Sequence, residues 1–259
     1  MRFTKHSVPL LVVGRQRAGT RFLTSCLNQF SGVSIQGEIP NPVMKDVQAL
    51  VDGTERYYAR RAEGGDEQHR REYRLWGKKK EKLIFSMWAY SGQSKAVIPK
   101  SRCAYFGYKR PNNEFYFEFY EEHLKRRPPV YIYCIRNFVD NYLSIASRWP
   151  ERKIAEVAKD YMQSIEQYHL MKKAAPDRVF PFVLDRHIEE GVSYLETHIL
   201  QPLGLANQGE VLSRIASKGA VNTAEGKVGH RRRDLTRREQ RFLNKRPDIA
   251  NAFQAFLEN

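Results

Sequence analysis

The sequence has few of the features that mark secreted, metal-binding or membrane-spanning proteins. It contains only three cysteines, an odd and widely spaced set that argues against a disulfide framework and shows no metal-ligand spacing. Its longest apolar runs, such as residues 9–14 and 130–135, have the length of strands and are too short for a membrane helix. Residues 1–7 lack the apolar core of a signal peptide. These absences predict a cytoplasmic protein with no transmembrane segment.

Internal repeats and low-complexity linkers are also absent, so the 259 residues predict a single domain, residues 1–259, with a full core. Acidic residues are outnumbered, because 44 lysines and arginines against 29 acids give a formal net charge of +15. This excess predicts an anionic partner: a nucleotide, a nucleic acid, an acidic glycan or an anionic lipid. Part of it lies between Arg56 and Lys82, where the pattern looks helical and breaks at Gly64-Gly65. We expect residues 45–95 to form a helical cap or flap.

Short β-rich runs alternate with longer helical ones along the rest of the chain. The expected strands are residues 9–14, 33–37, 103–108, 130–135 and 179–184, and the expected helices are residues 20–30, 114–125, 139–149 and 154–174. This alternation predicts an α/β fold, a doubly wound and mostly parallel sheet with helices on both faces, in three α/β/α layers.

A basic, glycine-containing loop, residues 14–22, joins the first expected strand to the first helix. Main-chain N–H groups at such a junction point toward a bound anion, and the helix dipole favours negative charge. The Lys-Ser/Thr pair of ATP-binding loops, whose hydroxyl binds Mg²⁺, is missing. We therefore expect arginines and backbone amides to bind a nucleotide without a metal. The alternative is an ordinary strand-to-helix turn with surface arginines.

A second strand–helix junction carries Arg136 at the end of an expected strand and Ser144 two helical turns later. These side chains could bind one phosphate together, because ligands of open α/β sheets lie at the carboxyl ends of strands. The alternative is a structural cap and a serine on the helix face.

The two junctions together resemble the sulfotransferases that use 3′-phosphoadenosine 5′-phosphosulfate. Residues 16–21 resemble the family's loop for the 5′-phosphosulfate, with departures at Gln16, Ala18 and Arg21. The family's 3′-phosphate motif is matched in register by Arg136, Asn137, Asp140 and Ser144, although Phe138 replaces its proline.

A third likeness lies near the C-terminus, where residues 226–236 resemble the family's Gly-x-x-Gly stretch that closes over the cofactor. The aromatic residue often found after the second glycine is missing. The resemblance implies that the cofactor transfers its sulfuryl group to a hydroxyl or amine of a carbohydrate, a lipid or a small molecule. The product formed from the cofactor would be adenosine 3′,5′-bisphosphate. No metal and no nucleic acid are expected, and the acceptor could be an anionic glycan or lipid.

The resemblance also assigns roles to particular residues. Arg17 would neutralise charge at the bridging oxygen, and Thr20 would donate its hydroxyl to the 5′-phosphate. The residues expected to bind the cofactor are Arg15, Arg17, Ala18, Gly19, Thr20, Arg21, Phe22, Arg136, Ser144, Lys227, Val228, Gly229 and Arg231.

A general base must take the proton of the acceptor, and Glu38 is the first candidate because it follows the second expected strand. His69 and His123 are in reserve, although neither lies at an expected strand end. A solvated loop carboxylate is the alternative for Glu38. Lys109, at the end of another expected strand, either touches the acceptor or is a solvated lysine, and the second is expected.

Two other functions remain open from the sequence. An atypical P-loop nucleotide kinase or hydrolase would need an acidic Mg²⁺ ligand after a strand, and none is convincing. A basic nucleic-acid-binding protein would fit the charge and would show steep salt dependence. The sequence specifies neither the acceptor nor the oligomeric state.

Overall fold

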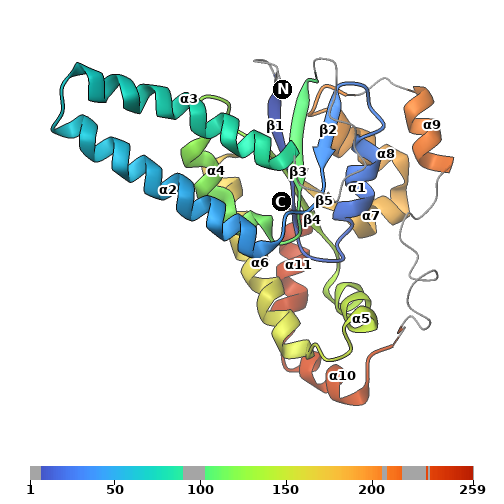
Figure 1. Cartoon of the computed structure of the whole chain (residues 1–259). Helices are drawn as coiled ribbons and strands as arrows, with labels where there is room; N and C mark the ends of the chain where they lie inside the picture. Colours follow the sequence, from blue (N-terminus) through green and yellow to red (C-terminus); the bar gives the residue numbers. More distant parts are fainter. Residues whose placement is uncertain (1–6, 90–102, 206–208, 218–231, 233, 259) are drawn as a thin grey trace. The chain divides into compact units, whose positions relative to one another are not determined.

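A computed structural model describes residues 7–89, 103–205, 209–217, 232 and 234–258. Its five strands form one sheet in the order β2-β3-β1-β4-β5 (Figure 1). The bounds are β1 Val8–Gly14, β2 Val33–Gln36, β3 Tyr105–Lys109, β4 Val130–Ile135 and β5 Val179–Val183. β1 is central, with β3 on one side and β4 on the other, so the chain winds outward in both directions. This parallel sheet with its connecting helices confirms the predicted α/β fold.

The described chain divides into two compact units. The first comprises residues up to 11, 31–110 and 116–130, and the second comprises residues 12–30, 111–115 and 131–259. The single domain expected from the sequence stays a prediction, as does the role of the 45–95 segment, whose residues 90–95 lie outside the described residues. Among the described helices, none combines the length and the apolar character needed to cross a membrane.

In the first unit, β2 and β3 pair in parallel, with Val33 opposite Tyr105 and Gln36 opposite Tyr108. Two 23-residue helices, α2 (Asn41–Glu63) and α3 (Glu67–Ala89), form an antiparallel hairpin beside them (Figure 1). This hairpin confirms the predicted charged helices and their break at Gly64-Gly65. The short helix α4 (Phe117–His123) completes the unit, whose core includes Trp88 between the rings of Tyr108 and Tyr120.

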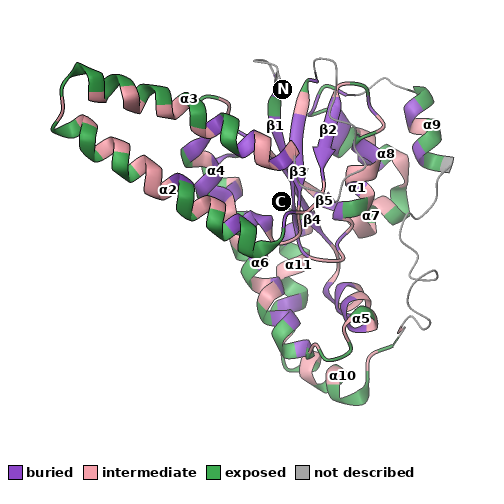
Figure 2. Ribbon diagram, in the orientation of Figure 1, coloured by how far each residue is buried: buried purple, intermediate pink, exposed green. Residues whose placement is uncertain are grey.

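The hairpin has buried side chains only near its base. They are Met44 and Val51 in α2 and Glu81, Ile84, Phe85 and Trp88 in α3. Residues 52–80 include none, and Figure 2 shows this part in the colours of exposed and intermediate residues. Polar contacts join the two helices there, because Glu55 accepts hydrogen bonds from Tyr73 at 2.9 Å, Trp76 at 2.7 Å and Lys80 at 2.8 Å.

In the second unit, β4 pairs in parallel with β5, and its residues 131–135 are all buried. This agrees with the apolar run from which the strand was predicted, because a central parallel strand is covered on both faces. The helices of the unit include α1 Thr20–Leu27, α5 Phe138–Arg148, α6 Ile154–Ala174 and α11 Pro247–Glu258. The others are α7 Leu184–Glu190, α8 Val192–Leu195, the π-helical turn η2 Glu196–Leu200, α9 Gly209–Ser217 and α10 Arg237–Asn244.

Two helix predictions need correction at their ends. α1 ends at Leu27 and not at Phe30, because the chain tightens at Asn28 and turns at Gly32, which has a φ of 87°. The helix expected over residues 114–125 begins as a 3-10 turn, η1 (Asn113–Tyr116). Its Glu114 is fully buried and bound to Gly14, and this distant contact fixes the backbone before α4 begins.

Gly14 provides a test of how closely β1 packs on β4. Its φ is 108°, and an added Cβ would lie 2.1 Å from the carbonyl oxygen of Cys134. We expect Gly14→Ala to lower the free energy of unfolding by about 3 kcal/mol or more, from backbone strain and overpacking together. Urea denaturation measures this change.

Gly77→Ala is the matched control, since a Cβ there meets nothing within 4 Å in the middle of α3. It should stabilise the protein by about 0.5–1 kcal/mol. Equal stability of the Gly14→Ala and wild-type proteins would contradict the packing described for β1.

Candidate functional site

The loop after β1 has the backbone of an anion-binding turn. Gly14, Arg17 and Gly19 all have positive φ, at 108°, 68° and 89°. For Arg17 this left-handed conformation is strained, and such strain is concentrated at functional sites. α1 then starts at Thr20. The first N–H groups of a helix have no intrahelical partner, and in α1 no side chain caps them. Those amides are available to a negatively charged group.

Hydrogen bonds with residues 112–114 fix the start of this loop. The N–H of Asn112 donates to the carbonyl of Gly14 at 2.8 Å, and the N–H of Gly14 donates to the Glu114 carboxylate at 3.0 Å. Ser164 donates to the other oxygen of Glu114 at 2.5 Å. Burial raises the pKa of Glu114, whereas these hydrogen bonds and the charge of Arg15 oppose the rise. Glu114 therefore positions the first residue of the loop.

The side chain of Arg15 is turned into the protein. It is 3% exposed, donates to Oδ1 of Asn112 at 3.0 Å and lies 3.6 Å from the carboxylate of Asp160. These contacts give Arg15 a part in fixing the loop. The cofactor contact expected of it stays a prediction.

The loop meets the second junction through two hydrogen bonds. Nε of Arg17 donates to Oγ of Ser144 at 2.9 Å, and Nδ2 of Asn141 donates to the carbonyl of Gln16 at 2.8 Å. The structure therefore brings together Arg17 and Ser144, which lie 127 residues apart in the sequence. Asn141 is fully buried and was missed, although it lies one helical turn before Ser144 on α5.

Arg136 lies between two carboxylates at the end of β4. Its Nη2 is 3.4 Å from Asp140, and its Nε is 3.8 Å from Asp185. Asp185 also accepts the N–H of Asn137 at 2.7 Å, and burial raises the pKa of this carboxyl, against the hydrogen bond and the charge of Arg136. Nε of Arg136 is buried with no hydrogen-bond partner among the described residues. Asp185 lies in the first turn of α7 (Leu184–Glu190) and was missed because no local motif marks it.

The other expected loop residues lie at the start of α1. Ala18 and Thr20 are buried, Gly19 is half-buried and Arg21 is exposed. The ring of Phe22 lies 4.8 Å from the ring of His187. Burial lowers the pKa of His187, and an interaction of its ring with the backbone of Gly191 opposes this. The contacts of Phe22 and His187 do not indicate a ligand for this aromatic pair.

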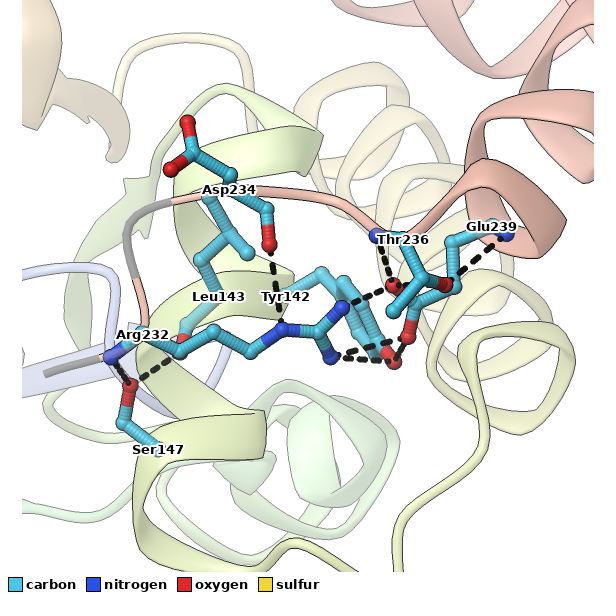
Figure 3. A network of polar contacts seen from close by, with 7 residues as sticks. All are labelled: Tyr142, Leu143, Ser147, Arg232, Asp234, Thr236 and Glu239. Atoms are coloured by element: carbon cyan, nitrogen blue, oxygen red, sulfur yellow. Dashed lines mark hydrogen bonds and ion pairs between the residues drawn. The ribbon is translucent and has the colours of Figure 1, made fainter. Parts of the chain in front are cut away.

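A polar network ties the chain at Arg232 to α5 (Figure 3). The N–H of Arg232 donates to Ser147 at 2.9 Å, and its guanidinium binds both carboxylate oxygens of Glu239. Tyr142 also donates to Glu239, and Thr236 caps α10. Four residues expected to bind the cofactor lie outside the described residues, namely Lys227, Val228, Gly229 and Arg231.

In the first unit, Glu38 follows β2 and forms an ion pair with Lys109, the last residue of β3. The Glu38 side chain is 43% exposed, and its Oε2 has no hydrogen-bond partner among the described residues. The prediction that Lys109 is solvated is wrong, because Lys109 is only 6% exposed and its ammonium group contacts Glu38. Sequence spacing gave no sign of this pair, which the pairing of β2 with β3 creates.

The two reserve histidines have partners of their own. His69, in α3, lies 2.9 Å from Asp66, and His123, at the end of α4, contacts Asp52 at 2.8 Å. Neither follows a strand. In the described part of the chain, no three His, Cys, Asp or Glu side chains form a group that could bind a metal.

Glu239 gives a prediction about pH. Burial pushes the pKa of this carboxyl up, but hydrogen bonds from Arg232, Tyr142 and Thr236 outweigh it and lower the pKa to about 2. The contribution to stability is therefore present above pH 4.5 and is lost as the pH falls toward 2. Glu239→Gln should lower the free energy of unfolding at pH 7 by about 1 kcal/mol, after allowance for solvent screening.

Urea denaturation at pH 7 and pH 3 checks this prediction, with Glu151→Gln, an exposed carboxylate, as the control. The difference between Glu239→Gln and wild type should shrink at the lower pH. A difference that is the same at both pH values would contradict the lowered pKa.

A scan of protein-family models and a search of curated proteins found no match to this chain. Among solved structures, it is similar to the sulfotransferase domain of the Synechococcus PCC 7002 olefin synthase, with a TM-score of 0.50 and 17% identity over 87% of this chain and 86% of that one. It is also similar to mouse sulfotransferase SULT7A1 complexed with PAP, with a TM-score of 0.47 and 15% identity over 90% of this chain and 73% of that one. At this identity the first likeness identifies the fold alone: the chain has the sulfotransferase fold.

Proposed function

We propose that this protein is a sulfotransferase that uses 3′-phosphoadenosine 5′-phosphosulfate and acts on a hydroxyl or amine of a carbohydrate, a lipid or a small molecule. The observation that carries the proposal is the 2.9 Å hydrogen bond between Arg17 and Ser144. It joins the two junctions to which the sequence resemblance assigned the two phosphate groups of one nucleotide.

The 5′ end of the nucleotide would bind at the loop. The first N–H groups of α1 are uncapped, and Arg17 is held at the same place by its strained backbone and by Ser144. Fixed donors of this kind neutralise charge that develops on a leaving phosphate without a reorganisation cost. Arg17 is accordingly the catalytic cation of the proposal, and Thr20 is the hydroxyl donor.

The 3′-phosphate would bind at Arg136 and Ser144. A phosphate oxygen suits the buried Nε of Arg136, which has no hydrogen-bond partner among the described residues. Asp140 and Asp185 hold the guanidinium in place at 3.4 and 3.8 Å, distances that are too long for strong hydrogen bonds. Arg136 therefore has binding capacity left for an anion.

Glu38 is the proposed general base. Lys109 holds one of its carboxylate oxygens, and the other has no hydrogen-bond partner among the described residues. A carboxylate fixed in this way can accept the proton of an acceptor hydroxyl or amine. Lys109 is buried and orients the base.

When bound, 3′-phosphoadenosine 5′-phosphosulfate supplies the sulfuryl group and leaves as adenosine 3′,5′-bisphosphate. The chain's own part is to position both phosphates, neutralise charge through Arg17 and remove a proton through Glu38. No step of this scheme requires a metal ion.

Ligand binding tests the nucleotide half of the proposal. By isothermal calorimetry, adenosine 3′,5′-bisphosphate should bind without Mg²⁺, and Arg17→Ala should weaken binding about 10- to 100-fold, since a hydrogen bond to a charged group is lost. Arg148→Ala, which removes an exposed arginine from α5, is the control and should bind as wild type does.

Binding of ATP–Mg²⁺ with no binding of the bisphosphate would overturn the proposal in favour of a nucleotide kinase or hydrolase. Tight binding of duplex DNA or RNA, with no binding of either nucleotide, would instead favour a nucleic-acid-binding protein.

Glu38→Gln tests the base. The variant should bind adenosine 3′,5′-bisphosphate as wild type does, because Glu38 is not among the proposed phosphate ligands. Its rate of sulfuryl transfer, measured by release of the bisphosphate with a panel of hydroxyl and amine acceptors, should fall about 10²- to 10⁴-fold. Glu118→Gln, an exposed carboxylate on α4, is the matched control. Wild-type turnover of Glu38→Gln would remove Glu38 as the base.

A further inference from the structure

The helical hairpin of the first unit takes no part in the proposed chemistry. Between Arg56 and Lys82 it carries ten lysines and arginines against five acidic residues. Its residues 52–80, here called the hairpin arm, include no buried side chain. The arm extends beyond β2 and β3 of its own unit (Figure 1). Polar contacts and the stacked rings of Tyr58 and Trp76 join the two helices of the arm, which lack the buried apolar face from which helical stability in proteins normally comes.

One face of α3 concentrates the cations that have no partner. Arg71, Lys78, Lys79 and Lys82 are all exposed, and none forms an ion pair within the described residues. Arg71, Lys78 and Lys82 follow one another at spacings of seven and four residues, which places them on one helical face over about 16 Å.

Each acidic residue of α3 pairs with an arginine outside this group of cations. Glu81 is buried and lies 3.3 Å from Arg127, and Glu72 lies 3.8 Å from Arg61 of α2. Glu67 is at the start of the helix and pairs with Arg70 at 3.3 Å. The exposed face therefore has an uncompensated positive charge.

Two leucines lie among these cations. Leu75 is 43% exposed and follows Arg71 by one helical turn, and Leu83 is 36% exposed and lies beside Lys79 and Lys82. A soluble polyanion, such as a nucleic acid or an acidic glycan, offers charge but little apolar surface to these side chains. A lipid bilayer offers both, because its headgroups are anionic and its acyl region begins just below them.

We propose that this face of α3, formed by Arg71, Leu75, Lys78, Lys79 and Lys82 with Leu83 at its edge, binds the surface of an anionic lipid bilayer. The cations contact the headgroups, and the two leucines enter the headgroup–acyl boundary. Contacts from Glu55 to Tyr73, Trp76 and Lys80 keep the opposite side of α3 on α2, so that the cationic face points outward. The surface charge thus brings the protein to the surface of a membrane.

Vesicle co-sedimentation of the full chain tests this inference. Vesicles of phosphatidylcholine with 30 mol% phosphatidylglycerol (about one anionic lipid in three) should bind the protein at low salt, and pure phosphatidylcholine vesicles should not. The triple variant Lys78→Glu/Lys79→Glu/Lys82→Glu should lower the partition coefficient by about 100-fold or more, since each basic residue near the surface contributes about fivefold. Leu75→Ser/Leu83→Ser should lower it by about tenfold.

A second triple variant controls for net charge. Lys153→Glu/Lys159→Glu/Lys173→Glu makes the same change of charge at three exposed positions, one just before α6 and two within it, and should bind vesicles nearly as wild type does. Unchanged far-UV circular dichroism and an unchanged midpoint of urea denaturation show that each variant is folded. These readouts do not depend on a sulfotransferase activity.

Three results would overturn the proposal. The first is equal loss of binding in the two triple variants, which would show that net charge alone acts. The second is wild-type binding by Leu75→Ser/Leu83→Ser, which would leave the leucines without a role. The third is binding of heparin or duplex DNA through α3 with no binding of anionic vesicles, which would make the partner a soluble polyanion.

Discussion

The close approach of Gly14 to the backbone of Cys134 is the constraint on which the loop after β1 depends. A Cβ at this position would lie 2.1 Å from the Cys134 carbonyl oxygen, so only glycine fits between the two strands. The N–H and carbonyl of Gly14 are then fixed by Glu114 and Asn112. These two hydrogen bonds set the direction of the loop before Arg15, its first arginine. The later contacts of the loop, including that of Arg17 with Ser144, depend on this position of Gly14.

Carboxylate side chains give the arginines of the second unit their positions. Arg15 has Asp160, Arg136 has Asp140 and Asp185, and Arg232 has Glu239. A carboxylate partner limits the conformations of a long side chain, so less entropy is lost when an anion binds. The contact distances differ, however. Arg232 is saturated by short contacts with Glu239, whereas Arg136 has longer ones and a free Nε, so Arg136 is the better phosphate ligand.

Local patterns in the sequence predicted most of the elements and part of the site. The apolar run at residues 130–135 gave β4 with its observed bounds, because a strand covered on both faces needs no polar positions. Arg17 and Ser144 were assigned to one nucleotide from motif spacing, and the structure places them in contact. The contacts of Asn141, Asp185 and Lys109 were not predicted, because their partners lie at sequence separations of 125, 48 and 71 residues.

The sequence by itself determined the alternation of strands and helices, the glycine-containing loop and the excess of positive charge, since these depend on neighbouring residues and on composition. Only the tertiary structure decided which charges are used. Arg15 turned inward to Asp160, Lys109 was buried against Glu38, and Arg71, Lys78 and Lys82 were left exposed without an acidic partner. The physical reason is that an ion pair depends on distance in space, which strand order and helix packing set and local sequence does not.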